Sequence, residues 1–349
     1  MRLAVRVPTS NQVASRAAIV EVAQAAEALG FYAISAHDHL VFNGWWVACG
    51  AKDWPGAGDD RDMYELLTTL SFVAGKTERV RLLTGVIVPP MRETVLMAKQ
   101  IATLDVLSEG RVLLGVGIGA QVQRDASGGH ANDMKLGAHA VNALKEYETF
   151  KVPRQRGKMT DEQLAAMRII WTEDVASFEG RYVQFHEIEV FPKPVQPGGP
   201  PILIGGRSEA ALRRAVRYGN GWLPNSISPQ QYAEGVARLR QIAADEGKPA
   251  PTEFGLNIFT HVGPSDAAAL DVFRPTVGRV FTDEALIAGN LVGSPATVAR
   301  RLCEFQAAGV NLVELKPIYR GVPDLIRQME VLAREVLPAV AAAAPAAAG

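Results

Sequence analysis

Two adjacent polar residues stand where an α/β protein would place its chemistry. Asp38 and His39 follow His37 at the end of an apolar run from residue 31 to residue 36. Polar side chains at the carboxyl end of an inner strand occupy the catalytic face of α/β barrels. An imidazole held by a neighbouring carboxylate can donate to developing charge or exchange a proton near neutral pH, so this pair is a candidate acid-base site. The alternative is a structural histidine that is merely hydrogen-bonded. His37 is expected to point to the opposite side of the strand and to be structural.

A second candidate is a strand that ends in spaced glycines. Residues 107–120 read LSEGRVLLGVGIGA, with Gly115, Gly117 and Gly119 after the apolar run. Backbone without side chains can lie against a flat or anionic ligand, which predicts the floor of a cofactor site; a simple tight connection is the alternative. A Rossmann fingerprint does not fit. The spacing is not G-x-G-x-x-G, no helix opens directly after it, and three strand-helix units precede it.

A third candidate is an anion site at the start of a helix. Gly205, Gly206, Arg207 and Ser208 follow the apolar run PPILI. Free backbone amides and the helix dipole at such a point favour an anion, whereas the alternative is an ordinary capped helix with an exposed arginine. Barrels usually hold phosphate after the last two strands, but this segment follows the fifth predicted strand.

The tryptophans allow two interpretations each. Trp45, Trp46 and Trp54 lie in an irregular segment between residues 41 and 62, where they either line an apolar substrate pocket or form a small satellite core. Trp222 precedes Asn225 at a predicted strand end, where it either borders a cofactor or packs.

Composition limits the class of protein. The 349 residues are 48% hydrophobic with a net charge of −1. Such a balance predicts neither a nucleic-acid nor a membrane surface and favours a small-molecule partner. Cys49 and Cys303 are far apart and in no CxxC spacing, so neither a disulfide framework nor a metal site is expected. The start, MRLAVRVPTSNQ, lacks the apolar core of a signal peptide and no run is long enough to span a membrane, so a cytoplasmic protein is expected.

These sites require elements that bring strand ends together. Hydrophobic periodicity predicts eight strands that alternate with helices, at residues 3–7, 31–36, 80–88, 111–114, 200–206, 221–224, 254–262 and 311–316. A closed (β/α)8 TIM barrel is the economical arrangement, with long insertions after strands 2 and 4. A hairpin over residues 175–191 is expected outside the barrel, and Thr160 to Gln163 is interpreted as a capping box. We expect one domain over residues 1–338 and a disordered low-complexity tail over residues 339–349.

The motifs together resemble the luciferase-like monooxygenase superfamily. They read AHDHL, TGVIVPP, AKQIATLDVLSEGRVLLGVGIG, SFEGRYVQF, PKPVQPGGPPILIGG and YGNGWLP, and they cover most of the chain. Members of this superfamily are TIM barrels that use FMN or the deazaflavin coenzyme F420. The similarity is strongest to the actinobacterial F420-dependent branch.

The resemblance assigns roles to particular residues. It implies that Asp38 and His39 form the Asp-His pair whose histidine faces the reactive part of the deazaflavin. It implies a non-proline cis peptide, Gly85-Val86, behind the cofactor ring. The other cofactor-binding positions that it implies are the strand beside the ring, Gly117, Ile118 and Gly119, and the phosphate segment, Gly205, Gly206 and Arg207.

The expected activity follows from the same resemblance. We expect an oxidoreductase that transfers a hydride between F420 and a small organic substrate, and an homo-oligomer. The alternatives are a two-component monooxygenase that uses reduced FMN from a separate reductase, and a flavin-binding barrel without turnover. The last is motivated by Ala120, which stands where several F420 enzymes carry a proton-donating glutamate. The segment from Gln121 to Lys158 also lacks the family's usual tryptophan.

Overall fold

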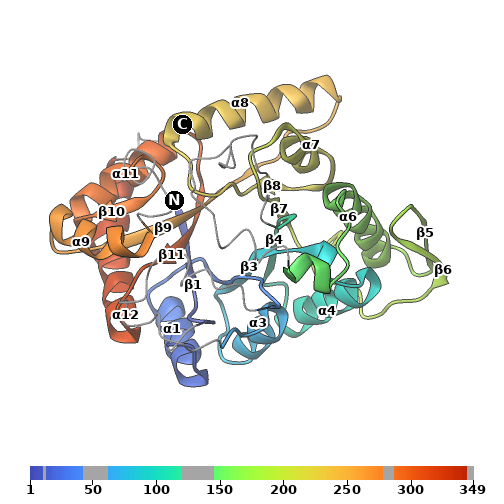
Figure 1. Ribbon diagram of the computed structural model, residues 1–349, viewed down its shortest axis with the longest axis horizontal. Helices are drawn as coiled ribbons and strands as arrows, with labels where there is room; N and C mark the ends of the chain where they lie inside the picture. The colour runs from blue at the N-terminus through green and yellow to red at the C-terminus, as the bar shows by residue number, and fades with distance from the viewer. Residues whose placement is uncertain (11–12, 42–61, 120–144, 278–286, 344–349) are drawn as a thin grey trace.

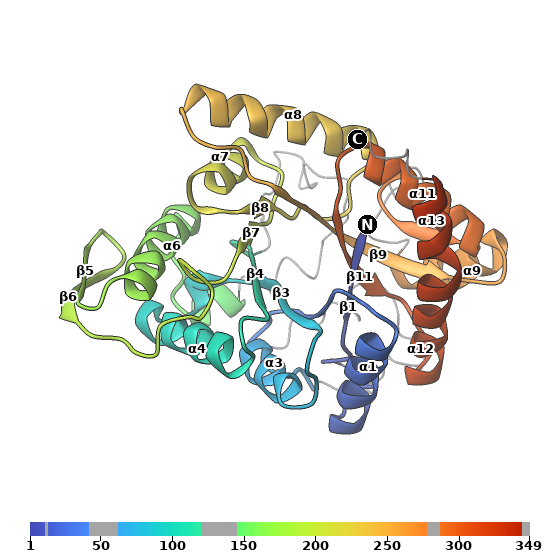
Figure 2. The ribbon, with the colours of Figure 1, turned by 180° about the vertical axis from the view of Figure 1, so that it is seen from behind.

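A computed structural model describes residues 1–10, 13–41, 62–119, 145–277 and 287–343. Within these residues eight parallel strands close into a barrel (Figures 1 and 2). In order around the barrel they are β1 (Arg2–Arg6), β2 (Ala33–Ala36), β3 (Arg81–Ile87), β4 (Val112–Val116), β7 (Ile202–Ile204), β8 (Gly221–Trp222), β9 (Glu253–Val262) and β11 (Leu312–Pro317). The last strand pairs with β1 and closes the ring. The predicted TIM barrel and its eight strands are confirmed.

Helices surround the barrel and connect its strands. They are α1 (Arg16–Ala28), α3 (Leu66–Ala74), α4 (Thr94–Leu107), α6 (Arg156–Thr172), α7 (Glu209–Tyr218), α8 (Pro229–Asp245), α9 (Asp266–Val277), α11 (Pro295–Ala307), α12 (Val322–Val331) and α13 (Leu337–Ala343), with a 3-10 turn at Pro89–Met91 and a π-helical turn at Leu332–Val336. Ser208 caps α7 as the sequence indicates, and Ser15 caps α1 in the same way, because each hydroxyl accepts a backbone N–H three residues on. None of the described helices is long and apolar enough to cross a membrane.

Three features differ from the sequence-based prediction or add to it. The Thr160 capping box is wrong: α6 begins at Arg156, and the Thr160 hydroxyl donates to the Arg156 carbonyl inside the helix. Gln163 is buried and donates to the Pro89 and Arg92 carbonyls, so tertiary contacts replace the cap. The short strand β10 (Leu291–Gly293), which pairs with the end of β9, and helix α9 before it were not predicted.

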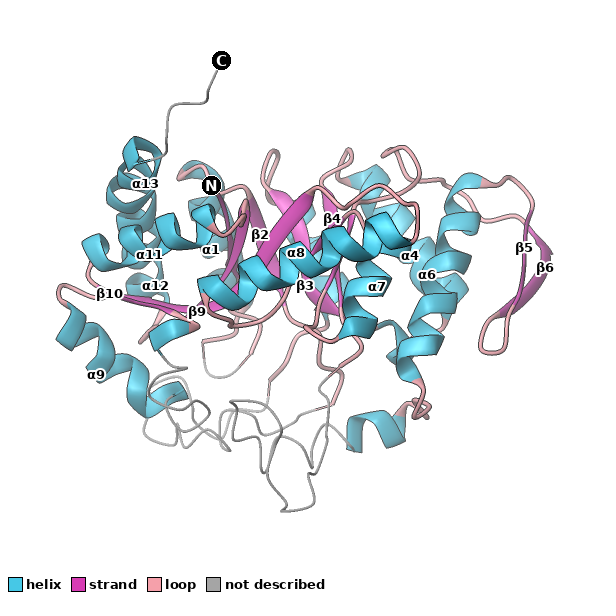
Figure 3. Cartoon of the chain, turned by 90° about the horizontal axis from the view of Figure 1, so that it is seen from above, coloured by secondary structure: helices cyan, strands magenta, loops and turns pink. Residues whose placement is uncertain are grey.

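The hairpin outside the barrel is confirmed. Strands β5 (Ala176–Glu179) and β6 (Gln184–Ile188) form a separate antiparallel sheet. Figure 3 shows this hairpin beyond α6, at one side of the molecule and away from the barrel strands. At the other end of the chain, α13 continues to Ala343 with Val340 buried, so helical structure extends beyond residue 338.

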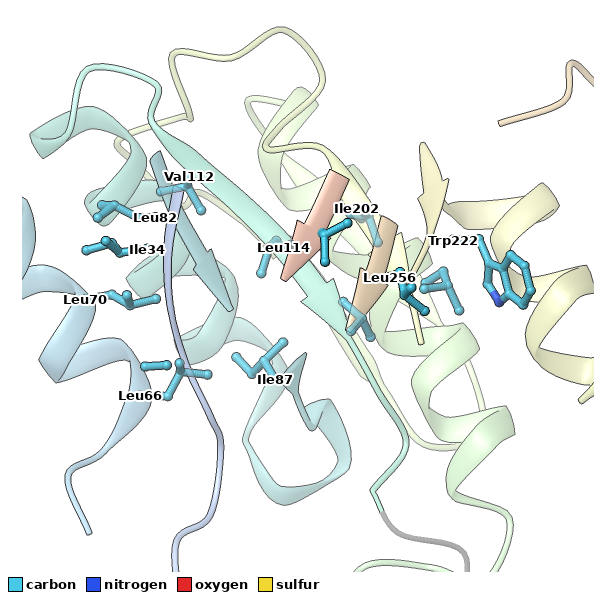
Figure 4. Packing of buried hydrophobic residues seen from close by; sticks show 14 of the residues in the cluster. Ile34, Leu66, Leu70, Leu82, Ile87, Val112, Leu114, Ile202, Trp222 and Leu256 are labelled. Carbon is cyan, nitrogen blue, oxygen red and sulfur yellow. The ribbon is translucent and has the colours of Figure 1, made fainter. Parts of the chain in front are cut away.

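Two apolar layers hold the barrel. The larger lies between the outer faces of the strands and the helices, and Figure 4 shows part of it, including Ile34, Leu82 and Leu114. The smaller fills the barrel interior toward the amino ends of the strands and consists of Ala4, Ala33, Leu83, Leu113, Leu203, Leu223 and Leu312. Alternation along each strand then places the next inward residues one layer nearer the carboxyl ends, and there the interior becomes polar.

Candidate functional site

Three glycines at the ends of neighbouring strands lie together at the carboxyl end of the barrel. They are Gly85, Gly117 and Gly205, and we call this group the glycine surface. The Gly85-Val86 peptide bond at the end of β3 is cis, which confirms the expected conformation. A Cβ atom on Gly117 would lie 2.6 Å from Val86 Cγ2, so the end of β4 lies directly against this cis peptide. The Gly205 amide donates to the Val116 carbonyl at 2.7 Å and brings β7 alongside. The structure therefore joins segments that are more than 100 residues apart in sequence.

The turn between β7 and α7 presents donors at this same edge. Gly206 has a φ of +96°, a conformation that strongly favours glycine, and Arg207 is exposed. No described residue accepts a hydrogen bond from the Gly206 or Arg207 amide, and no described carboxylate pairs with Arg207. The Ser208 cap starts the ten-residue helix α7, whose dipole adds partial positive charge. The arrangement is that of an anion-binding helix start.

Trp222 lies behind this turn. It is 1% exposed, and its ring packs on Tyr232 of α8 with 5.0 Å between ring centroids. Its indole N–H donates to the Gly206 carbonyl at 2.7 Å. Figure 4 shows the side chain on the outer side of the strands, beside the yellow ribbon of α8. Of the two interpretations of Trp222, the structure supports packing: it fixes the conformation of Gly206 from outside.

His39 is held by a carboxylate that the sequence analysis did not identify. Its Nδ1 lies 3.3 Å from Glu146 Oε2, and the Glu146 side chain is 3% exposed. The other oxygen accepts the backbone N–H groups of Leu40 and Val41 at 2.5 and 3.1 Å. Burial alone would raise the pKa of Glu146, but the His39 ring and these two amides outweigh it and lower the pKa. Glu146 is therefore a charged anchor for the turn after β2.

The residue after Glu146 connects this anchor to the glycine surface. Tyr147 is buried with Val88 and Met91. Gly119 has a φ of +78°, and a Cβ atom there would overlap the Tyr147 hydroxyl. One helical turn thus fixes the ends of both β2 and β4. No sequence motif indicated Glu146 or Tyr147, because they lie in the irregular segment after β4 and the contacts of Glu146 reach back more than 100 residues.

The Asp38 side chain does not hydrogen-bond to His39 and has partners of its own. Its two carboxylate oxygens accept Arg92 Nη1 and Nη2 at 2.6 and 2.7 Å, and the Val88 amide also donates to Oδ2. Arg92 in turn donates to Glu65 at 2.8 Å. Adjacent residues of an extended segment face opposite sides, which explains why Asp38 reaches into this buried network while His39 faces the barrel mouth.

The prediction for His37 is wrong in its direction. The His37 and His39 rings lie 5.7 Å apart between centroids, because residues two apart share one face of an extended segment. His37 Nδ1 lies 3.2 Å from the Thr9 hydroxyl. Burial, with the nearby Arg6 and His39, lowers the pKa of His37, so its ring is neutral near pH 7.

The predicted substrate-pocket residues Trp45 and Trp46 lie outside the described residues, as does Trp54. The described sites are the glycine surface, the Gly206 turn and the His39 and Glu146 pair.

A polar layer inside the barrel supports the glycine surface from below. Glu314 is fully buried, and its carboxylate accepts Arg6 at 2.7 Å, the Ser35 hydroxyl at 2.8 Å and the Asn257 amide. Arg6 also donates to the Gly85 carbonyl at 2.6 Å. Arg6 in the apolar run at residues 3–7, and Glu314 and Lys316 two positions apart at residues 311–316, are the sequence signal for this layer, since alternation places Arg6 and Glu314 on the inner face.

We expect Gly85→Ala to destabilise the fold. A Cβ atom at residue 85 would overlap the Glu314 carboxylate, which three hydrogen-bonding partners hold in place. Overpacking of this kind lowers the free energy of unfolding by about 1–3 kcal/mol, which unfolding in urea measures. Gly75→Ala is the matched control, because the nearest atom to a Cβ there is 3.7 Å away. Equal stability of the two variants would contradict the tight contact.

We expect Glu146→Gln to destabilise the protein in a pH-dependent way. Loss of charged hydrogen bonds to a buried group costs about 1–3 kcal/mol. Because the pKa of folded Glu146 lies below its ordinary value, its contribution is complete above that ordinary value and is lost as the pH falls through the folded value. The difference in unfolding free energy between wild type and variant should therefore be large at neutral pH and shrink in acid. A difference that grows in acid would contradict this account.

The residues at the barrel mouth fit a flat cofactor that carries an anionic tail. Gly117 leaves bare backbone against Val86, where any side chain would collide. The Gly206 and Arg207 amides and the Arg207 side chain supply donors and charge for an anion beside it. A flavin or deazaflavin with its phosphate meets both requirements.

Comparison with known proteins agrees with this geometry. A sequence model of the luciferase-like monooxygenase family matches residues 1–312. An uncharacterised protein of Mycobacterium tuberculosis is 33% identical over 55% of this chain, and the match spans 66% of that relative's length. An F420-dependent hydroxymycolic acid dehydrogenase of the same organism is 29% identical over 75% of this chain and 64% of its own. An FMNH2-dependent dimethylsulfone monooxygenase of Pseudomonas putida is 25% identical over 82% of this chain and 80% of its own.

Solved structures share the fold at low sequence identity. An F420-dependent secondary alcohol dehydrogenase in complex with an F420-acetone adduct superposes with a TM-score of 0.75 at 19% identity, over 97% of this chain and 98% of that one. The monooxygenase RslO1 from Streptomyces bottropensis gives 0.74 at 21% identity, over 97% and 99%. Since the family model covers most of the sequence, the chain belongs to the luciferase-like monooxygenase family and is an enzyme of its oxidoreductase class.

Proposed function

We propose that this enzyme transfers a hydride between coenzyme F420 and a small organic substrate. The observation that carries the proposal is the juxtaposition, at one end of the barrel, of a buried Glu146 that holds His39 and a bare glycine surface. The F420-dependent relatives named above support the choice of cofactor. Membership of an enzyme family argues against a flavin-binding barrel without turnover.

Each part of the site has a proposed role. The Gly206 and Arg207 amides bind the cofactor phosphate, with Trp222 holding the turn from behind. Val86 and Gly117, with Gly85, Ile118, Gly119 and Gly205 around them, support the flat ring. When bound, F420 supplies the hydride chemistry.

The proton is the task of the protein's own side chains. His39 accepts or donates it at the imidazole, and Glu146 keeps that ring in one orientation. Asp38, through Arg92, fixes the turn that carries His39 and acts as a positioning residue. Trp45 and Trp46 remain proposed contacts for the substrate.

The second candidate is a monooxygenase that receives reduced FMN from a separate reductase. It is favoured by the FMNH2-dependent relative, whose match covers more of this chain than that of the F420-dependent dehydrogenase. The two candidates differ in their need for oxygen.

Turnover under controlled oxygen separates them. F420 absorbance is followed anaerobically with a panel of small alcohols and ketones, and oxygen uptake is followed in parallel with reduced FMN and the same panel. The hydride-transfer proposal predicts a substrate-dependent change in F420 absorbance without oxygen. Substrate-dependent oxygen consumption with reduced FMN, and no anaerobic change in F420, would contradict it.

A further inference from the structure

Lys316 is a buried lysine at the mouth of the barrel that the proposed reaction does not use. It lies two residues after Glu314 on β11, so alternation directs it inward, one layer nearer the carboxyl ends. It is 8% exposed, and its Nζ lies 3.9 Å from the centroid of the Phe259 ring on β9. It donates to Asn225 Oδ1, just beyond the end of β8.

No described carboxylate forms an ion pair with Lys316. Glu314 is the nearest acidic side chain on its own strand, and Arg6, Ser35 and Asn257 already occupy its oxygens. Arg6 adds a further positive charge nearby. Burial, followed by the repulsion from Arg6, lowers the pKa of Lys316 well below its usual range, although Glu314 opposes this. Burial thus disfavours the charged form of Lys316, which a bound anion would stabilise.

The hydrogen-bonding groups also point to an incoming acceptor. Asn225 Oδ1 accepts from Lys316 and lies 3.1 Å from the Ser226 hydroxyl, so this oxygen faces donors of the protein. No described residue accepts from the Asn225 amide nitrogen, and this side chain is exposed at the mouth. Lys316 keeps two further N–H groups. Donors therefore converge from β11 and β8 without matching acceptors, next to an aromatic ring.

We propose that Lys316 and Asn225 bind a carboxylate of the substrate, so that the enzyme acts on organic acids whose apolar part packs on Phe259. The proposal deepens the proposed function, on which it relies only to place the substrate at this end of the barrel. It assigns the specificity of the site to strands β8, β9 and β11. The cofactor residues proposed above lie instead at the carboxyl ends of β3, β4 and β7.

Benzoate and benzamide test the proposal because they share one shape and differ in charge. Binding of each is measured by calorimetry to the full-length protein without cofactor. We expect benzoate to bind more tightly than benzamide. Lys316→Met should weaken benzoate about tenfold or more, the scale for a lost hydrogen bond to a charged group, and leave benzamide nearly unchanged. Lys248→Met, at an exposed lysine, is the matched control and should change neither.

Asn225→Asp provides a second variant at an exposed position, so folding is not at risk. The new carboxylate would lie beside Lys316 and take the place of the benzoate carboxylate as its partner. Benzoate affinity should therefore fall at least as far as in Lys316→Met. Equal affinity for the two probes, undetectable benzoate binding, or benzoate binding that survives both variants would overturn the proposal.

A further arm separates the substrate from the cofactor as the source of the anion. Saturation with F420 or FMN should leave benzoate binding in place. Displacement of benzoate by either cofactor would overturn the proposal, because the anion site would then belong to the cofactor. Failure of cofactor binding itself would appear in the cofactor titration alone and leave the benzoate result intact.

Discussion

His39→Ala should lower turnover by about 100-fold or more while leaving the fold and cofactor affinity nearly intact, the latter within roughly tenfold. The imidazole is only partly buried, and its Glu146 partner keeps two backbone donors when the ring is removed. The loss is therefore expected in the proton-transfer step. The measurements are kcat under saturating cofactor, cofactor affinity and the melting temperature.

A second histidine provides the matched control. His186 lies on the outer hairpin with a side chain that is 71% exposed, and its only described ion pair is with Glu179. His186→Ala should change neither turnover nor stability. If His39→Ala instead lowers the melting temperature and leaves turnover per folded molecule near that of wild type, His39 is a structural residue and its proposed role is withdrawn.

Gly206→Asp should weaken cofactor binding by about 100-fold or more. It places a carboxylate where backbone amides are proposed to meet phosphate, and juxtaposed like charges cost several kcal/mol. The φ of +96° at Gly206 strains any side chain, so charge must be separated from shape. Gly206→Asn has the same shape without the charge, and asparagine tolerates positive φ better than most residues.

The contrast between these two variants carries the test. Affinity for F420 and for FMN is measured by fluorescence titration of both proteins. Asparagine should lower affinity modestly and aspartate far more. An acidic residue favours a helix start, so aspartate should not be the less stable of the two. Equal affinity in both variants would contradict the phosphate assignment.

Much of the barrel follows from local sequence patterns. Strand-length apolar runs separated by helical periodicity predict all eight strands, and Ser208 marks the start of α7 because its cap is a contact within one turn. The same local pattern, two glycines before a capped helix, predicts free backbone amides at Gly206 and Arg207. Thr160 shows the limit of this approach. Residues 160–163 match a capping box, but the helix already begins at Arg156, and the buried Gln163 side chain donates to the Pro89 carbonyl.

The parts that escape prediction depend on contacts between distant segments. Glu146 reaches His39 across 107 positions, and Glu314 reaches Ser35 across 279. No local pattern encodes such pairs, although the charges on the inner faces of β1 and β11 signal a polar interior. Asp38 illustrates the same limit: adjacency in sequence suggests that it orients His39, whereas its geometry directs it to Arg92.

Parallel titration of the wild-type enzyme with F420 and FMN tests the central claim most directly. Both cofactors are titrated under identical anaerobic conditions, and their dissociation constants are compared, with Gly206→Asp as the variant that must lose binding. The account predicts saturable F420 binding that is tighter than FMN binding and depends on Gly206. Tighter binding of FMN, or F420 binding that Gly206→Asp leaves unchanged, would contradict it.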